Sequence, residues 1–339
     1  MSLSVGPSPD RRSGSSGELL LRNYELARVS VALVDVDGVT RLENRAKVMC
    51  YAASIMKLAV AVAVLRELDR GKLSPDDLLA YDGGFASGLD GTRFTIDDDS
   101  VDPELFLLDG SDGLSDHAGI GEFAKGGEVF PGRWVRKMAG SRSVLVQSAR
   151  PTSGDRMVSV ARALRRSITV SSNEAANLLM QAVGLEAVNW VLLEAGCDNS
   201  VVERMVFDGP ARDAGRTNML TALDAAQLMW NIRFGRIAAD DSLTYLCQVL
   251  RCQTQRSMIP YALDAAIDGD EVVVGNKEGQ TNDVLHDVAF IEPDDTDPFV
   301  LAVCTAGLTE QEATTAVRKI ATHAYEHRFS WKSLADNFR

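Results

Sequence analysis

The order of apolar segments in this 339-residue sequence predicts an α+β fold, in which an antiparallel sheet packs against helices. A β-branched apolar run lies near the N-terminus, at 29–36. Three more such runs, at 271–276, 284–291 and 299–305, follow one another near the C-terminus, and a helical segment, 309–327, comes last. Because the chain between them has a helical pattern, we expect one sheet built from both ends of the chain, flanked by N- and C-terminal helices, and a separate all-helical lobe.

The first strand ends at a turn, Asp37-Gly38, and a polar stretch leads to residues 48–51, a second strand or an entry loop. The next segment, 55–68, is rich in Ala and Leu and contains no Gly or Pro. At this length it predicts a buried helix, with Ser54 as its cap and Gly71 at its end.

Helices are also predicted at 156–185, 187–196 and 217–234, the last capped by Thr217 or Asn218, with two or three further helical turns to about residue 265. Thr309 is the expected cap of the final helix, where acidic residues in the first turn favour the positive end of the helix dipole.

Three regions of the chain differ in composition. Residues 1–24 begin with a stretch rich in Ser, Gly, Pro and Arg and predict a disordered tail. Residues 25–339 predict a single domain, with an α/β lobe at 25–53 and 220–339 and a helical lobe at 54–219. Within the helical lobe, residues 82–155 are rich in Gly and Asp and form an irregular insertion, which is either a lid, a partner surface or a solvated decoration.

The overall charge and the cysteines narrow the class of protein. A formal net charge of -13 argues against a nucleic-acid partner, and no membrane span is indicated. The five cysteines are scattered and form no CxxC pair, which argues against a disulfide framework and a zinc site. No apolar segment typical of a signal peptide follows Met1. We therefore expect a cytoplasmic protein, unless a leader has been removed, that acts on a small molecule without a metal or cofactor.

Three short motifs carry candidate chemistry, and the first is Ser54-Ile55-Met56-Lys57. Residues three apart on a helix lie on one face, so Lys57 is placed to accept the proton of the Ser54 hydroxyl. The apolar segment around Lys57 lowers the pKa of a lysine by burying it. Alone the motif is weak, because S-x-x-K arises about once by chance in a chain of this length.

The second motif is Ser171-Ser172-Asn173 at the start of a predicted helix. A hydroxyl at Ser171 could pass a proton to a leaving group, and the amide of Asn173 could bind a substrate carbonyl. The alternative is a plain helix cap. The third motif is Lys277-Glu278-Gly279, at the end of the strand 271–276. It would place a positive charge beside the reacting centre and let the strand edge approach a substrate closely, although a charged edge strand is common.

Taken together, these motifs resemble the S-x-x-K, S-x-N and K-[ST]-G set of the class A β-lactamases and penicillin-binding proteins. The segment 171–179 and the segment 215–224 resemble that family too, and the likeness covers roughly residues 25–81 and 156–328. The resemblance implies a β-lactamase/transpeptidase-like fold and an acyl-enzyme formed on Ser54.

By the same resemblance, Lys57 is the proton acceptor, and Ser171 with Lys277 relays a proton to the leaving group. Asn173, Glu278 and Gly279 border the substrate. The backbone N–H groups of Ser54 and Gln280 form the oxyanion hole. His286, on the strand that follows, either lines the cleft or is an exposed strand histidine.

Two departures from the family bear on activity. Glu278 replaces a hydroxyl residue that helps to bind a substrate carboxylate, which disfavours penicillins unless Glu278 turns away or pairs with Lys277. The E-x-x-L-N motif, whose Glu activates the deacylating water in class A β-lactamases, is absent. Asp208 is the nearest candidate base and is at least as well explained as a surface loop residue. The sequence therefore leaves three functions open: a hydrolase of small amides, peptides or esters, a true β-lactamase, and a non-catalytic binding protein.

Overall fold

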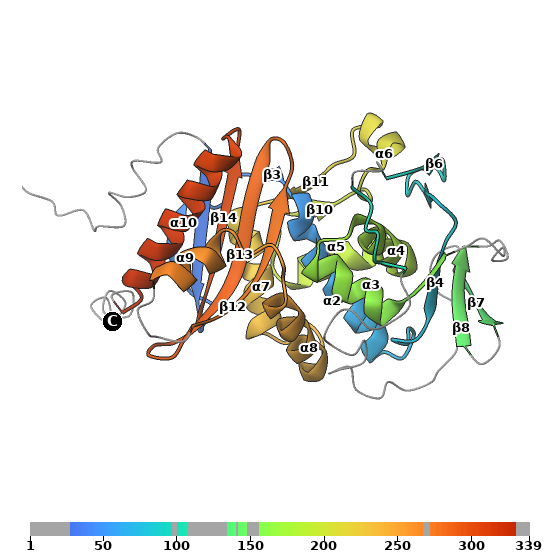
Figure 1. Ribbon diagram of the computed structural model, residues 1–339, viewed down its shortest axis with the longest axis horizontal. Coiled ribbons are helices and arrows are strands. Elements are labelled where there is room, and N and C mark those ends of the chain that lie inside the picture. The colour runs from blue at the N-terminus through green and yellow to red at the C-terminus, as the bar shows by residue number, and fades with distance from the viewer. Residues whose placement is uncertain are drawn as a thin grey trace, which may run out of the picture.

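The structure is a computed structural model, and it describes residues 28–96, 100–106, 134–139, 142–147, 156–266 and 272–329. In this part of the chain the largest sheet has five strands in the order β12-β13-β14-β1-β2, every neighbouring pair antiparallel. The strands are β1 (Val29–Asp35), β2 (Thr40–Asn44), β12 (Val272–Gln280), β13 (Val284–Pro293) and β14 (Phe299–Ala306). The predicted α+β fold is confirmed, because both ends of the chain build one antiparallel sheet (Figure 1). The expected tail, 1–24, and N-terminal flanking helix fall outside the described residues.

The main sheet separates two hydrophobic cores. Successive side chains of a strand point to opposite faces, so Leu301 of β14 belongs to one core and Val300 to the other. The helices α9 (Ile259–Ala266) and α10 (Glu310–Glu326) cover the first face, and α7 (Ala222–Arg233) covers the second (Figure 1). The capping box at the start of α10, formed by Thr309 and Glu312, confirms the predicted cap.

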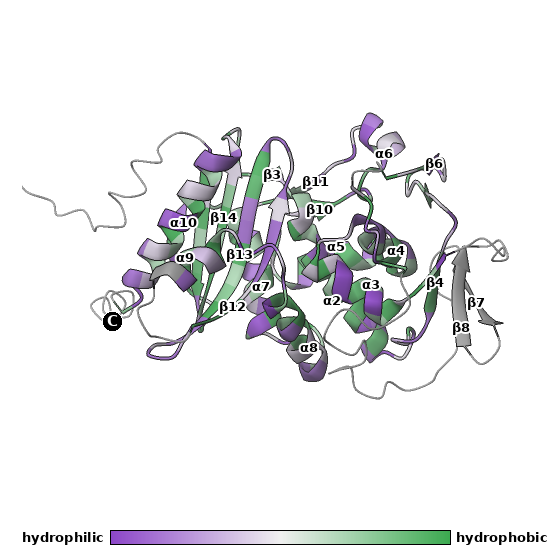
Figure 2. Cartoon of the chain, in the orientation of Figure 1, coloured by the Kyte–Doolittle hydropathy of each residue, from purple (hydrophilic) through white to green (hydrophobic). Residues whose placement is uncertain are grey.

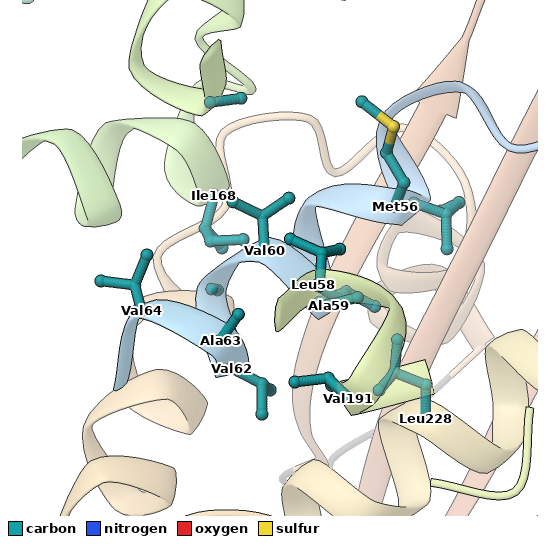
Figure 3. Packing of buried hydrophobic residues seen from close by; sticks show 14 of the residues in the cluster. Met56, Leu58, Ala59, Val60, Val62, Ala63, Val64, Ile168, Val191 and Leu228 are labelled. Atoms are coloured by element: carbon teal, nitrogen blue, oxygen red, sulfur yellow. The ribbon is translucent and has the colours of Figure 1, made fainter. Parts of the chain in front are cut away.

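The helical lobe is built around α2 (Lys57–Asp69). Around it pack α3 (Val160–Thr169), α4 (Asn173–Val183) and α5 (Leu185–Glu194), and also α8 (Asp240–Arg251), which lies outside the predicted bounds of this lobe and contacts β12 as well. Figure 3 shows Val60 and Val62 of α2 among Ile168, Val191 and Leu228 of neighbouring helices. Each Val or Leu buried in this way stabilises the fold by about 1.5–3 kcal/mol. The start of α2 is therefore a rigid platform.

Hydropathy follows this arrangement, with hydrophobic residues inside the helical lobe and hydrophilic ones on the outer turns of α8 and α10 (Figure 2). No single helix among the described residues is long and apolar enough to cross a membrane. The helices α4 and α5 reach that length and hydropathy only when taken together, and they are bent by 89° relative to each other.

Three smaller sheets complete the described fold. The first has the order β10-β11-β3, from β10 (Val201–Val202), β11 (Asn218–Leu220) and β3 (Cys50–Tyr51). The second has the order β7-β8-β4-β9, from β4 (Leu78–Tyr81), β7 (Trp134–Ala139), β8 (Arg142–Gln147) and β9 (Arg156–Ser159). The third is the pair β5 (Phe85–Ala86) and β6 (Arg93–Phe94). The predicted insertion thus contributes strands to the body of the protein.

Several predicted boundaries are wrong. The helix predicted over 156–185 begins as β9 and is interrupted at 170–172, between α3 and α4. Residues 218–220 form β11, which pairs with β3 and β10 instead of opening a helix, and Thr221 caps α7 by accepting a hydrogen bond from the Asp224 N–H. The polar stretch after β1 contains β2, which pairs with β1, and β12 runs on to Gln280, so that Lys277 lies inside the strand. Strand pairing overrides local propensity at 40–44, 156–159 and 218–220, whereas the break at 170–172 is marked by the Ser172 cap of α4.

Candidate active site

A cleft of about 550 Å³ opens where β12, which is an edge strand, meets the 3₁₀ turn η1 (Ala53–Met56) and the segment 204–208. The residues that line it include the predicted Ser54, Ser171, Asn173, Glu278 and Gln280. Three motifs that are far apart in the sequence therefore border one cavity.

Ser54 lies in η1, half-buried at the wall of the cleft. The prediction that Ser54 caps the helix is wrong, because a 3₁₀ turn precedes α2 and neither element has a side-chain cap. The Ser54 hydroxyl is consequently not engaged by the helix end.

The backbone at the cleft is held in an unusual conformation. Among the described residues, four that are not glycine have a positive φ, and three of them line this cleft: Ala53 at 44°, Ser171 at 58° and Phe207 at 62°. A residue of this kind costs of order 1–3 kcal/mol and persists only where the surrounding structure imposes it. Ala53 directly precedes Ser54, so this strain sits next to the expected nucleophile.

Lys57 is fully buried beneath the cleft. Its Nζ donates to Ser171 O at 2.5 Å, to Asn173 Oδ1 at 2.8 Å and to Ser171 Oγ at 3.3 Å. Burial, and after it the charge of Lys277, holds the pKa of Lys57 well below its usual range, although Glu278 opposes this. The described residues show no hydrogen bond between Lys57 and the Ser54 hydroxyl. Catalytic contacts of this kind often tighten only when substrate is bound.

Ser171 connects the two buried lysines. Lys277, also fully buried, donates from Nζ to Ser171 Oγ at 2.9 Å, and the Nζ of Lys57 contacts the same oxygen. Burial lowers the pKa of Lys277, while the carboxylates of Glu278 and Asp287 oppose that effect. One hydroxyl at the cleft thus lies between two ammonium groups that lose their charge more easily than free lysines.

Glu278 pairs with Lys277, one of the two arrangements expected from the sequence. Lys277 Nζ lies 3.2 Å from Glu278 Oε1 and 2.8 Å from Glu278 O. Burial raises the pKa of Glu278, but the charges of Lys277 and Lys57 and hydrogen bonds from Lys277 and Ser171 outweigh it, so the pKa is lowered overall. An ionised carboxylate therefore borders the cleft.

Gly279 brings β12 against the turn that carries Ser54. A Cβ at Gly279 would lie 3.1 Å from Ser54 N, 3.1 Å from Ile55 Cγ1 and 3.2 Å from Ala53 Cβ. The sequence predicts that a glycine here lets the strand edge approach a substrate closely. The structure shows in addition that β12 passes close to the backbone of Ser54. Gln280, the next residue, is exposed and lines the cleft.

His286 is not in the cleft. It is fully buried, and its ring contacts Tyr51 O at 2.9 Å and the Thr305 N–H at 3.2 Å. Both expectations, a cleft-lining and an exposed histidine, are wrong. The reason is that His286 shares the sheet face of Val288 and Phe290, which packs against the helical lobe.

Asp208 lines the cleft, but it is buried instead of lying on a surface loop. Its carboxylate accepts hydrogen bonds from Ser87 Oγ at 3.0 Å, Gly88 N at 3.2 Å and Ala211 N at 3.1 Å. With these three donors it caps α6 (Gly209–Asp213) and fixes the edge of the insertion. The prediction of a surface loop residue is therefore wrong, and the candidate base is already engaged.

Two further residues that line the cleft, Arg204 and Val206, are not predicted from the sequence. Val206 is held through its backbone, since Asn177 Nδ2 donates to Val206 O and Val206 N donates to Asn177 Oδ1, both at 2.9 Å. Arg204 is buried and donates to Tyr51 Oη at 3.0 Å. Neither stands out in the sequence, because only the folded loop turns them toward the cleft.

The described part of the insertion forms a wall of the site. Ser100 lines the cleft, and the Asp102 N–H donates to both carboxylate oxygens of Glu174, at 3.0 and 3.1 Å. The Asp102 carboxylate forms a buried ion pair with Arg166 at 2.6 Å. Since Glu174 follows Asn173, this segment is tied directly to the second motif.

A Ser-x-x-Lys turn, a Ser-x-Asn helix start and a Lys-x-Gly edge strand lie around one cleft in this α+β fold. Together they define a serine-hydrolase-like protein with a β-lactamase/transpeptidase-like fold. The model of the beta-lactamase enzyme family matches residues 18–98 and 137–328. The chain belongs to this family.

Solved structures agree at the level of the fold. A beta-lactamase from Sphaerobacter thermophilus is similar over 92% of this chain and 95% of its own, with 22% identity and a TM-score of 0.63. PBP-A is similar over 93% and 96%, with 16% identity and a TM-score of 0.63. An ancestral class A beta-lactamase is similar over 91% and 98%, with 20% identity and a TM-score of 0.60. No curated protein matches the sequence.

Proposed function

We propose that this chain is a serine hydrolase that forms an acyl-enzyme through Ser54 on a small amide, peptide or ester. One observation carries the proposal: Ser54 and Ser171 line the same cleft, and the Ser171 hydroxyl contacts both buried lysines. The Ser171 hydroxyl thus links the cleft that Ser54 lines to two desolvated amines buried beneath it.

Acylation begins with attack of Ser54 Oγ on the substrate carbonyl, while neutral Lys57 takes the hydroxyl proton. The lowered pKa of Lys57 supports this role, because only the neutral amine is a base. When the tetrahedral intermediate collapses, the leaving group takes a proton from Ser171. Lys57 or Lys277 then returns a proton to Ser171 through the contacts already described.

The oxyanion would be held by the backbone N–H groups of Ser54 and Gln280. The close passage of β12 at Gly279, beside Ser54 N, supports this placement. A donor of this kind contributes about 3 kcal/mol to the transition state.

The charge on the cleft wall bears on the substrate. Glu278 keeps its negative charge beside Lys277, so a neutral or cationic substrate group is favoured next to β12. Arg204, on the segment 204–208, is a buried cation of the same cleft. A carboxylate-bearing substrate would therefore bind toward Arg204 and away from Glu278.

Hydrolysis of the acyl-enzyme is expected to be slow. The two acidic residues among the described lining residues are Asp208, whose carboxylate already accepts three hydrogen bonds, and Glu278, whose lowered pKa makes it a weak base. Val206, which also lines the cleft, has no proton-accepting side chain. The acyl group should consequently accumulate on Ser54 or pass to a nucleophile other than water.

The slow hydrolysis expected for the acyl-enzyme also favours a second candidate function, that of a binding protein that does not turn over a substrate. The two are separated by intact-mass measurement after incubation with a panel of β-lactams, activated esters and a fluorophosphonate. We expect addition of one acyl group to the wild-type protein and to Ser100→Ala, a cleft-lining control without contact to the lysines. Ser54→Ala should remain unmodified. If wild type and Ser54→Ala give the same unmodified mass with every reagent, the hydrolase proposal is wrong.

Nitrocefin turnover tests the third candidate, a true β-lactamase. We expect turnover no faster than that of Ser54→Ala, because of Glu278 and the missing base. Sustained turnover well above that control would instead establish β-lactamase activity.

A further inference from the structure

We propose that Cys50 and Cys304 are a redox-active thiol pair, which a hydroperoxide converts into a disulfide, and that this disulfide slows the acylation of Ser54. The first half of the proposal is independent of the function proposed above, and the second half rests on it.

Two thiols and an imidazole meet behind the cleft. Cys50 lies half-buried on β3, and Cys304 lies buried on β14 directly opposite His286 of β13. One ligand atom from each of the three side chains lies within 4.8 Å of the others, and Cys50 Sγ is 3.7 Å from His286 Nε2. The two sulfur atoms are thus neighbours on the sheet face that packs against the helical lobe.

The hydrogen bonds of His286 show which ring nitrogen carries its proton. The Thr305 N–H donates to Nδ1 at 3.2 Å, so Nδ1 is the acceptor and Nε2 carries the hydrogen. The Nε2–H group then donates to Tyr51 O at 2.9 Å and also faces Cys50 Sγ. A metal ion needs a free lone pair on the imidazole, and Nε2 does not offer one in this arrangement. The cluster is therefore better suited to thiol chemistry than to zinc.

The two thiols have different acidities. A hydrogen bond with Cys304, together with one hydrogen bond from His286 and the charge of its ring, lowers the pKa of Cys50 to about 5 against the opposing effect of burial. The same contact and burial raise the pKa of Cys304. Cys50 is a partly exposed residue with a lowered thiol pKa and a second thiol beside it, which is the usual arrangement of a redox-sensing cysteine.

The reaction balances with a hydroperoxide as oxidant. The Cys50 thiolate attacks the terminal peroxide oxygen, the O–O bond breaks, and Cys50 becomes a sulfenic acid while the alcohol or water leaves. The Cys304 sulfur then attacks the sulfenic sulfur, which releases its hydroxyl group with one proton as water. Two thiols are oxidised by two electrons and one peroxide is reduced.

The bond would alter the nucleophile because of where Cys50 lies. β3 is only two residues long, and its second residue, Tyr51, lines the cleft three positions before Ser54. A disulfide requires an S–S distance of about 2.0 Å. Because β14 is central in the main sheet, β3 is the partner that moves. Its movement is passed to Ser54 through Ala53, whose backbone φ is already 44°.

Peptide mapping under non-reducing conditions tests the disulfide directly. After treatment of the full chain with stoichiometric hydrogen peroxide, we expect a Cys50–Cys304 linked peptide that has lost two hydrogen atoms and is restored by dithiothreitol. Cys252→Ser, which removes the exposed thiol, should give the same peptide, and Cys304→Ser should not. The proposal is overturned if Cys50 and Cys304 both stay reduced while Cys252 is oxidised, or if the purified protein holds zinc that protects them.

Acylation kinetics test the consequence. Oxidised wild-type protein should acylate about tenfold more slowly than reduced protein and recover with dithiothreitol, and Cys304→Ser should not respond to peroxide. A linked peptide without any change in rate would refute the control of Ser54. If neither redox state acylates while the linked peptide still forms, the proposed hydrolase function fails and the thiol pair stands.

Discussion

Replacing Gly279 by alanine tests whether the packing of β12 against η1 positions the nucleophile. The added Cβ would lie 3.1 Å from Ser54 N and from Ile55 Cγ1, and 3.2 Å from Ala53 Cβ. These distances are shorter than an ordinary carbon contact of about 3.5–4.0 Å. Relief is limited, because one contact is to backbone and another is to Ala53, which is already held at a φ of 44°. The strand and the turn must therefore separate by several tenths of an ångström.

Two effects set the expected magnitude. Overpacking of this kind destabilises a protein by about 1–3 kcal/mol, and up to about 1 kcal/mol is returned because alanine restricts the unfolded chain. Displacing the Ser54 N–H from an oxyanion costs up to about 3 kcal/mol, which corresponds to roughly a hundredfold in rate. Acylation should therefore slow by about two orders of magnitude, with a smaller loss of stability.

The assay is the rate of acylation by an activated ester, followed by intact mass, together with denaturant unfolding. Gly209→Ala is the matched control, because its Cβ would approach nothing closer than Arg212 Nη2 at 4.0 Å and it lies beside the same cleft. We expect Gly209→Ala to match wild type in both measurements. If folded Gly279→Ala acylates at the wild-type rate, the close contact of β12 with Ser54 has no catalytic role.

Three further predictions concern charge. Because burial holds the pKa of Lys57 well below 10.5, the acylation rate should rise with pH through that lowered pKa and level off below pH 10.5. Lys57→Arg should remove this rise and slow acylation about 10²–10⁴-fold. A pH profile of the variant that matches wild type would exclude Lys57 as the base. Glu278→Thr should raise the acylation rate with a carboxylate-bearing β-lactam about tenfold or more relative to the rate with a neutral ester, because a like charge near the substrate carboxylate is removed. The same ratio of the two rates in wild type and variant would contradict this. Asp102→Ala should lower the unfolding free energy by about 3 kcal/mol, because it removes the buried carboxylate 2.6 Å from Arg166 and leaves that arginine its ion pair with the more exposed Glu104. Asp82→Ala, in an exposed pair, should cost about 1 kcal/mol or less, and similar losses for the two variants in denaturant titrations would refute the difference.

The sheet and its C-terminal helix could be predicted from the sequence because their patterns are long and regular. β13 and β14 are apolar runs between turns, and the cap of α10 has its own local motif. β3, β10 and β11 have two or three residues each, too few to show a period, and they exist only because they pair with one another. The same limit explains the helix predicted to begin at 217.

Within the candidate site, the motif residues around Ser54 and Lys277 were found because the reactive groups are close in sequence within each motif. The surroundings were not predictable in the same way. Both faces of β13 are covered by helices, so alternation along this strand does not distinguish an exposed side, and neither predicted position of His286 is correct. The roles of Asp102 and Val206 depend on contacts between segments far apart in the chain.

The two hydrogen bonds between the Asn177 side chain and the Val206 backbone bear on which substitutions this protein can accept. Both hydrogen bonds use backbone atoms at position 206, so the loop keeps its path whatever side chain stands there. The groups proposed to form the ester lie on other elements. The lifetime of that ester could then be retuned at one exchangeable position, without rebuilding the machinery that makes it.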